Sequence, residues 1–85
     1  MSRAAAIIEV VVRALADNVE AVTVREIERG EAKTIEVMTG PGDLGRMIGR
    51  QGRMAAALRT LAAIATEVDG SKVTVEFRDD LVADG

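Results

Sequence analysis

The chain has 85 residues, 48% of them hydrophobic, and a net charge of −3, which fits one small domain with an aliphatic core. It contains no Cys or His, which excludes disulfides, thiolate chemistry and zinc sites, so we expect neither a metal nor a cofactor. No apolar stretch reaches the ~20 residues of a membrane span and no signal-peptide pattern is visible, so we expect a cytoplasmic protein without a membrane partner.

A helix and a strand are expected first along the chain. Apolar residues recur with helical spacing over residues 3–17, which predicts a helix. These apolar residues are Ile7, Ile8, Val11, Val12 and Leu15. Val22 and Val24 then alternate with polar residues, which predicts a strand that bulges or ends at Glu26–Ile27.

A turn over residues 28–31 separates this strand from a second one. Thr34–Thr39 places Ile35 and Val37 on one face, and the two strands are close enough in the sequence to form a hairpin. Gly40-Pro41-Gly42 then ends the second strand.

Helices are expected next, and a strand after them. Asp43 is a suitable N-cap for a short helix over Leu44–Ile48, and the glycines of Gly49–Gly52 interrupt that helix. A longer helix is predicted from about Arg53 to Val68. Its apolar stripe is Met54, Leu58, Leu61, Ala65 and Val68, and we place Leu58, Leu61, Ile64 and Val68 in the core.

A last strand carries Val73, Val75 and Phe77 on one face, and Phe77 is the single aromatic residue of the chain. We therefore expect one α+β domain over residues 1–85, with its core over about 4–78 and an acidic tail over 79–85. The element order α-β-β-α-α-β predicts three helices on one face of a three-stranded sheet. The opposite face would be solvated and lacks stacking aromatics; its residues would be Thr23, Arg25, Glu36, Thr74, Glu76 and Arg78.

Positive charge is concentrated in one segment. Residues 44–66 hold four arginines and no acidic residue, so this segment is +4 and the rest of the chain is −7. A polyanion would dock where the local field is positive, despite the acidic total. The alternative is that these arginines simply cover a solvated helix face.

The glycine turn lies within this segment. Gly49 and Gly52 would let a phosphate backbone approach closely, and the helix that follows adds free N–H groups. Arg50 would meet a phosphate, with Gln51 as a neutral hydrogen-bonding group. Further candidate nucleic-acid-binding residues are Arg46 and Arg53, which flank the turn, and Ile48 and Met54, which would line an apolar groove for bases. A helix–turn–helix corner without a ligand is the alternative.

The run from Asp43 to Arg53, Asp-Leu-Gly-Arg-Met-Ile-Gly-Arg-Gln-Gly-Arg, resembles the signature of K-homology (KH) domains. The element order resembles the type II bacterial form of that fold, and Ile7 to about Phe77 resembles the small KhpA family. The resemblance implies an RNA-binding protein, chaperone-like or regulatory, that forms a homodimer or pairs with a larger KH-containing protein of the KhpB type. It also implies a link to cell elongation and the cell envelope. Met54 stands where Ile is more usual, which bears on the shape of the groove.

A protein-interaction adaptor is the rival hypothesis. The predicted long helix has an uncharged flank that could be a dimer surface, or could simply reflect helix propensity. This flank consists of Ala55, Ala56, Ala57, Ala62 and Ala63. Enzyme activity is not expected, because the carboxylates of the hairpin lack a nucleophile or a phosphate-binding lysine nearby. These carboxylates are Glu26, Glu28, Glu31 and Glu36.

Overall fold

The computed structural model describes residues 2–69 and 72–79, and its elements follow the predicted order. The helices are α1 (Arg3–Leu15), α2 (Leu44–Ile48) and α3 (Arg53–Asp69), with short 3₁₀ turns η1 (Val19–Ala21) and η2 (Arg50–Gly52). The strands are β1 (Thr23–Arg29), β2 (Ala32–Thr39) and β3 (Lys72–Asp79). The acidic tail was expected over 79–85, but Asp79 is the last residue of β3. The rest of that tail and the Val68 side chain, which was expected in the core, lie outside the described residues. Among the described helices, none has the length and apolar character that crossing a membrane requires.

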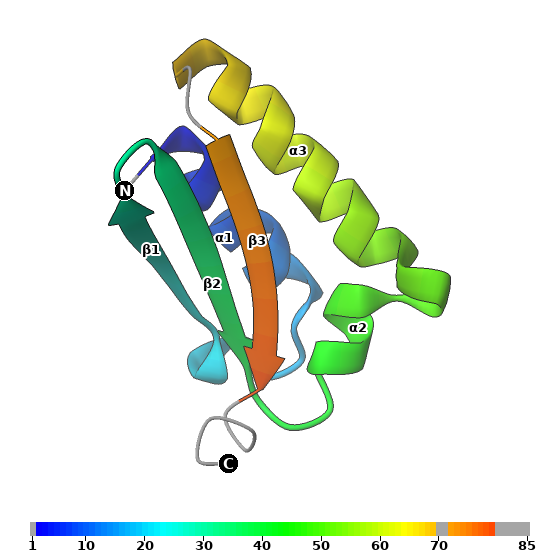
Figure 1. The fold of residues 1–85 in the computed structure, drawn as a ribbon. Coiled ribbons are helices and arrows are strands. Elements are labelled where there is room, and N and C mark those ends of the chain that lie inside the picture. The colour runs from blue at the N-terminus through cyan, green and yellow to red at the C-terminus, as the bar shows by residue number, and fades with distance from the viewer. Residues whose placement is uncertain (1, 70–71, 80–85) are drawn as a thin grey trace.

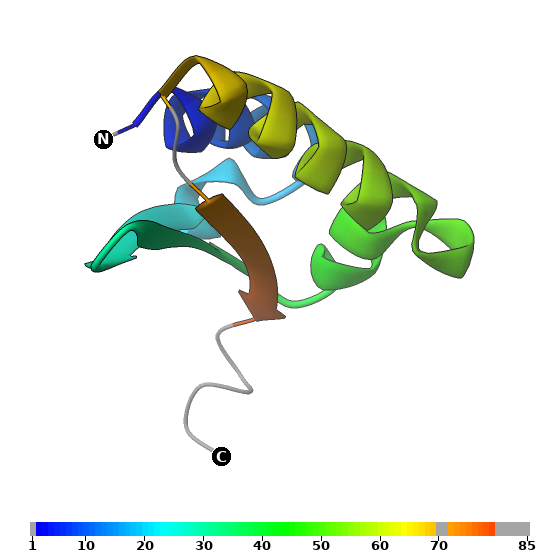
Figure 2. The same ribbon diagram turned by 45° about the horizontal axis from the view of Figure 1, so that its top comes forward.

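The three strands form one sheet with β2 in the centre (Figure 1). β1 pairs with β2 in antiparallel fashion, whereas β3 pairs with β2 in parallel. A parallel pair requires a crossover connection, and the bent unit of α2, η2 and α3 supplies it. α1 and this unit cover the same face of the sheet, and the other face is left open (Figure 2). The predicted α+β architecture is therefore confirmed.

The hairpin is more regular than predicted. Its register runs without interruption from the pair Thr23–Met38 to the pair Arg29–Ala32. The expected bulge or end at Glu26–Ile27 is wrong, because the tight turn at Gly30–Glu31 keeps both strands paired to their last residues. The apparent slip in the apolar pattern reflects a partly buried Ile27 on the open face.

Small residues of both α1 and α3 are buried in the core. The helices contact each other, and Ala62 and Ala65 of α3 are buried in one cluster with Ala4 and Ala5 of α1. Small side chains let two helix backbones approach closely. The remaining members of this buried cluster are Ile8, Val12, Val22, Val24, Ile35, Val37, Met47, Leu58 and Val75.

Three large apolar residues of the helices are on the surface. Leu61 is 40% exposed and Ile64 is 57% exposed, so their assignment to the core is wrong, whereas that of Leu58 is confirmed. Ile7 is 36% exposed on α1. Helical spacing alone does not fix which face of a helix meets the sheet: on α3 the buried residues include Ala62 and Ala65, whereas Leu61 and Ile64 are exposed.

The open face of the sheet is polar, as predicted, with one difference. Glu36 is only 7% exposed because two arginines cover it. Arg25 donates to its Oε1 at 2.9 Å, and the Arg78 guanidinium lies 3.7 Å from its Oε2. The negative charge at the centre of this face is thus paired, since a buried carboxylate needs partners.

Candidate nucleic-acid interface

The turn between α2 and α3 projects from one end of the molecule, away from the hairpin turn (Figures 1 and 2). η2 holds this turn, with Gly49 before it and α3 directly after it. We call Gly49–Arg53 the basic loop. Because it stands clear of the sheet, an extended ligand can reach its backbone from outside.

Gly49 is required by the geometry of the basic loop. Its φ of 74° and ψ of 175° fall in a region that is essentially restricted to glycine. A Cβ placed there would lie 2.8 Å from the Cβ of Met54 and 3.0 Å from its backbone nitrogen. Gly52 also has a positive φ of 72°, but a Cβ there would meet open space. The first glycine thus allows the turn to close, and the second leaves the outer surface of the loop bare.

The polar side chains of the basic loop gather around one hollow. Arg50, Gln51 and Arg53 line a shallow space of about 410 Å³. Arg53 donates from Nη2 to Oε1 of Gln51 at 3.0 Å, which orients both groups. Gln51 has a φ of 56° and a ψ of 24°, which turns the chain from η2 into α3. Two exposed guanidiniums beside a helix N-terminus make this hollow attractive to an anion.

Arg46 does not line this hollow, although the sequence groups it with Arg50 and Arg53. Its Nη2 lies 2.8 Å from Oδ2 of Asp17, and its Nε lies 3.8 Å from Oδ1 of Asp43. Asp17 belongs to the connection between α1 and β1, so this partner could not be foreseen from the neighbouring residues in the chain. Only two of the three predicted arginines therefore meet at the loop.

The two apolar candidates lie on either side of Gly49 but differ in burial. Ile48 is 39% exposed at the end of α2, whereas Met54 is half-buried and packs against the core cluster. Ile48 is thus available to a ligand, and Met54 supports the loop from within by its close approach to Gly49. That both residues line a groove for bases stays a prediction.

Asp43 anchors α2 in a way that the sequence did not indicate. It occupies the N-cap position of α2, as predicted, but its side chain forms no cap bond with that helix. Its Oδ1 accepts from the Asp17 backbone N–H at 3.1 Å, and its Oδ2 accepts from the Asn18 N–H at 3.0 Å. Asp43 is 2% exposed. Its carboxylate connects the residues that follow α1 to the start of α2. These two partners lie 26 and 25 residues away in the sequence, so no pattern close to Asp43 could have predicted them.

Replacing Asp43 by Asn is expected to lower the melting temperature, because an amide can accept one of these two N–H bonds through its oxygen but not the other. The N–H donors of Asn18 and Asp17 lower the pKa of the Asp43 carboxyl. A lowered pKa gives stability that is present above the ordinary value of about 3.9 and is lost as the pH falls through the lowered one. The stability gap between wild type and D43N should therefore be full at pH 7 and shrink below about pH 4.

Thermal unfolding followed by circular dichroism at pH 7 and near pH 3 measures this gap. Glu20→Gln, which removes an exposed carboxylate from η1, is the control and should change little at either pH. A gap between wild type and D43N that stays constant with pH would contradict the assigned role of the charge.

Comparison with known proteins defines the family. The family model described as KhpA/KhpB, KH domain, matches residues 5–77. The chain belongs to this family. The match to the KhpA/KhpB KH domain runs from α1 into β3 and includes the whole basic loop.

Members of the KhpA/KhpB family from distant bacteria are similar to the chain over most of its length. It is 40% identical to RNA-binding protein KhpA of Aquifex aeolicus over 77 residues, which are 91% of this chain and 98% of that protein. It is also 40% identical to RNA-binding protein KhpA of Caldanaerobacter subterraneus over 71 residues, 84% of this chain and 95% of the relative. With RNA-binding protein KhpA of Mycobacterium tuberculosis it shares 48% over 56 residues, 66% and 70% of the two chains. No solved structure matches the chain.

Proposed function

We propose that this protein binds single-stranded RNA through the basic loop. The observation that carries the proposal is the hollow of Arg50, Gln51 and Arg53 at a projecting glycine turn, in a chain whose family relatives are named RNA-binding proteins. The proposed RNA-binding residues are Arg46, Ile48, Gly49, Arg50, Gln51, Gly52, Arg53 and Met54. We further propose that the protein acts in the cytoplasm as an RNA chaperone or post-transcriptional regulator, with an effect on cell shape and the cell wall.

The proposed grip is on the RNA backbone. The bare outer surface at Gly52 admits a phosphate, and the guanidiniums of Arg50 and Arg53 neutralise it. The N-terminus of α3, which begins directly at the loop, adds N–H groups and partial positive charge. Because aromatic side chains for stacking are absent from this loop, base preference should be low.

A salt titration with labelled single-stranded RNA tests the proposal. If two arginines neutralise two phosphates, log K should fall against log salt with a slope of about −1.4, taking ~0.7 per phosphate for single strands. A duplex of the same sequence, whose backbone has a different shape, should bind more weakly. A folded wild-type protein that does not bind, or whose binding ignores salt, would remove the basis of the proposal.

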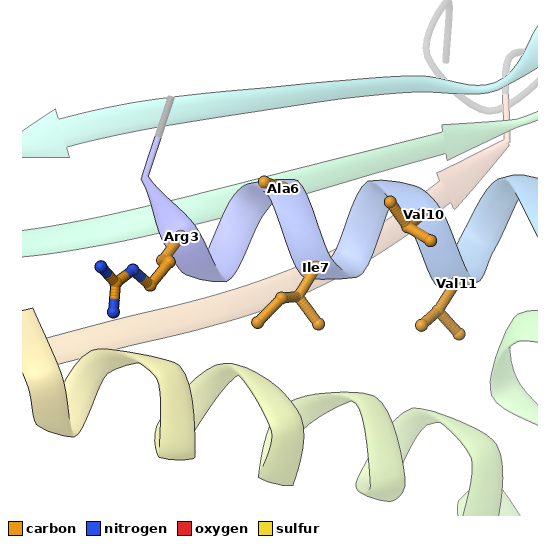
Figure 3. A pocket seen from close by; sticks show the side chains of 5 residues that line it. All are labelled: Arg3, Ala6, Ile7, Val10 and Val11. Carbon is orange, nitrogen blue, oxygen red and sulfur yellow. The ribbon is translucent and has the colours of Figure 1, made fainter.

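A second proposed function is self-association through the outer face of the helices. Four of the large exposed apolar residues lie there: Ile7 and Val10 on α1, and Leu61 and Ile64 on α3. A hollow of about 300 Å³ on α1 adds to this apolar surface, with Ile7 and Val11 pointing toward α3 (Figure 3). This hollow is lined by Arg3, Ala6, Ile7, Val10 and Val11.

We propose a second copy of this chain as the occupant of that face. Exposed alanines on α3 (Ala56, Ala57 and Ala63) leave room for a partner helix to approach. A dimer would carry two basic loops, and linking two weak sites raises the affinity for longer RNA through effective concentration. A KhpB-type protein is the alternative occupant, as the joint family description suggests.

The substitution Ile64→Glu is expected to turn a dimer into a monomer, because it places a charge within the apolar contact. Light scattering after size exclusion measures the mass. Val19→Glu is the matched control, since Val19 is 42% exposed but lies in η1 and is not one of the residues proposed for that face. A wild type that stays monomeric at high concentration contradicts self-association and directs attention to a KhpB-type partner.

A further inference from the structure

Arg46 stands on α2 three residues before Gly49, one helical turn below the basic loop. A strand that is gripped at the loop and continues along α2 meets Arg46 next. In the structure this guanidinium lies between two carboxylates, 2.8 Å from Asp17 and 3.8 Å from Asp43. Arg46, the arginine that precedes the basic loop, is therefore already paired with two carboxylates.

The two carboxylates hold Arg46 differently. The Asp43 side chain is 3% exposed and accepts two backbone N–H bonds, so its position is fixed. The Asp17 side chain is 73% exposed, and Arg46 is its one polar side-chain contact in the described part of the chain. Exposed ion pairs contribute only ~0–1 kcal/mol, and a phosphate can displace such a carboxylate. Arg46 itself is 55% exposed and can be reached by a ligand.

We propose that Asp17 is an affinity-determining residue that competes with RNA phosphate for Arg46. The inference rests on the proposed binding of RNA at the basic loop, and it adds a residue that weakens the binding of RNA there. Asp17 occupies the guanidinium and places a negative charge along the course of the strand. Each RNA that reaches past the loop must exchange the Asp17 carboxylate for a phosphate, so short RNAs that end at the loop are unaffected.

Asp17→Asn tests this competition. The Asn side chain has the same shape, and the backbone N–H of residue 17 still donates to Asp43, so the fold should persist. Affinity for single-stranded RNA at low salt should rise about two- to fivefold, which is the range that an exposed ion pair supports. The slope of log K against log salt should steepen by about 0.7, because one more phosphate is neutralised without a competing acid.

Two controls separate this effect from a change in net charge. Glu20→Gln removes one negative charge from the same connection, and Glu20 does not pair with Arg46. It should leave the salt slope unchanged. In the double variant Asp17→Asn/Arg46→Gln, the gain of the single variant should disappear, because the arginine that it frees is absent.

The outcomes distinguish this inference from the proposed function. If Asp17→Asn and Glu20→Gln behave alike, or if the gain survives without Arg46, the role of Asp17 is wrong while loop binding stands. If the folded wild type does not bind RNA, or if the variant with Asp at both Arg50 and Gln51 binds equally well, both proposals fail. A steeper slope that appears only in Asp17→Asn supports the competition.

Discussion

Replacing Arg50 and Gln51 together with Asp is expected to abolish binding to single-stranded RNA while the domain stays folded. The change puts two carboxylates into the hollow where a phosphate would sit, and it replaces the neutral oxygen that Arg53 contacts with a carboxylate that would compete with phosphate for the guanidinium. These carboxylates and an RNA phosphate carry charge of the same sign, so they would repel each other at a site that is positive in the wild type. We expect at least a 30-fold loss of affinity at low salt, or about 2 kcal/mol.

The fold should tolerate this double change for local reasons. Both side chains are exposed, and Asp is among the residues that best accept the left-handed backbone found at position 51, where φ is 56°. Arg29→Asp/Lys33→Gln is the matched control, because it shifts the net charge by the same amount but lies beside the hairpin turn, away from the basic loop. Fluorescence anisotropy with labelled RNA, beside circular dichroism, measures both properties. Equal losses in the two variants would mean that total charge, not the loop, governs binding.

Gly49→Ala is expected to destabilise the domain as well as to abolish binding. The φ and ψ of Gly49 cost a non-glycine residue about 1–3 kcal/mol, and the overlap with Met54 adds to that cost. For a domain of this size each kcal/mol lowers the melting temperature by about 4–8 °C, so a fall of about 10 °C or more is expected. RNA affinity should fall because the turn must open to relieve the contact.

Gly52→Ala is the comparison variant that adds a methyl group without the contact with Met54. Its positive φ also disfavours Ala, but the added methyl group meets no atom within 4 Å. The loss of stability should be about 1 kcal/mol, smaller than for Gly49. RNA affinity should still fall, because the methyl group occupies the surface that a phosphate would approach. If both variants melt at the same temperature, the Met54 contact does not set the requirement for Gly49.

The sequence predicted the elements of this fold because its patterns are local. Alternation in Val22 and Val24 and the break at Gly40-Pro41-Gly42 each depend on neighbours within a few residues. The element order and the glycine turn follow from such signals and are confirmed. The end of β1 was misjudged because the tight hairpin turn, not the apolar pattern, sets where pairing stops.

Long-range partners are what the sequence did not reveal. Arg46 is adjacent to the basic loop along the chain, yet its closest ion partner is Asp17 on another connection. The Asp43 carboxylate bonds to the same distant connection instead of capping its own helix. Likewise, Leu61 is exposed and its neighbour Ala62 is buried, in a cluster to which α1 also contributes residues. Each of these wrong predictions depends on a contact with a segment that is distant in the sequence.

The parallel pairing of β3 with β2 also bears on the order of folding. The β1–β2 hairpin closes a short turn, but β3 can join only after the whole crossover from Thr39 to Lys72 has been brought back to the sheet. Closing such a long connection is entropically costly and slow compared with forming a hairpin. The basic loop lies within this crossover, and α2, which precedes it, contacts β3. A chain that lacks β3 is thus expected to form the local turn but to lack part of the support beneath it.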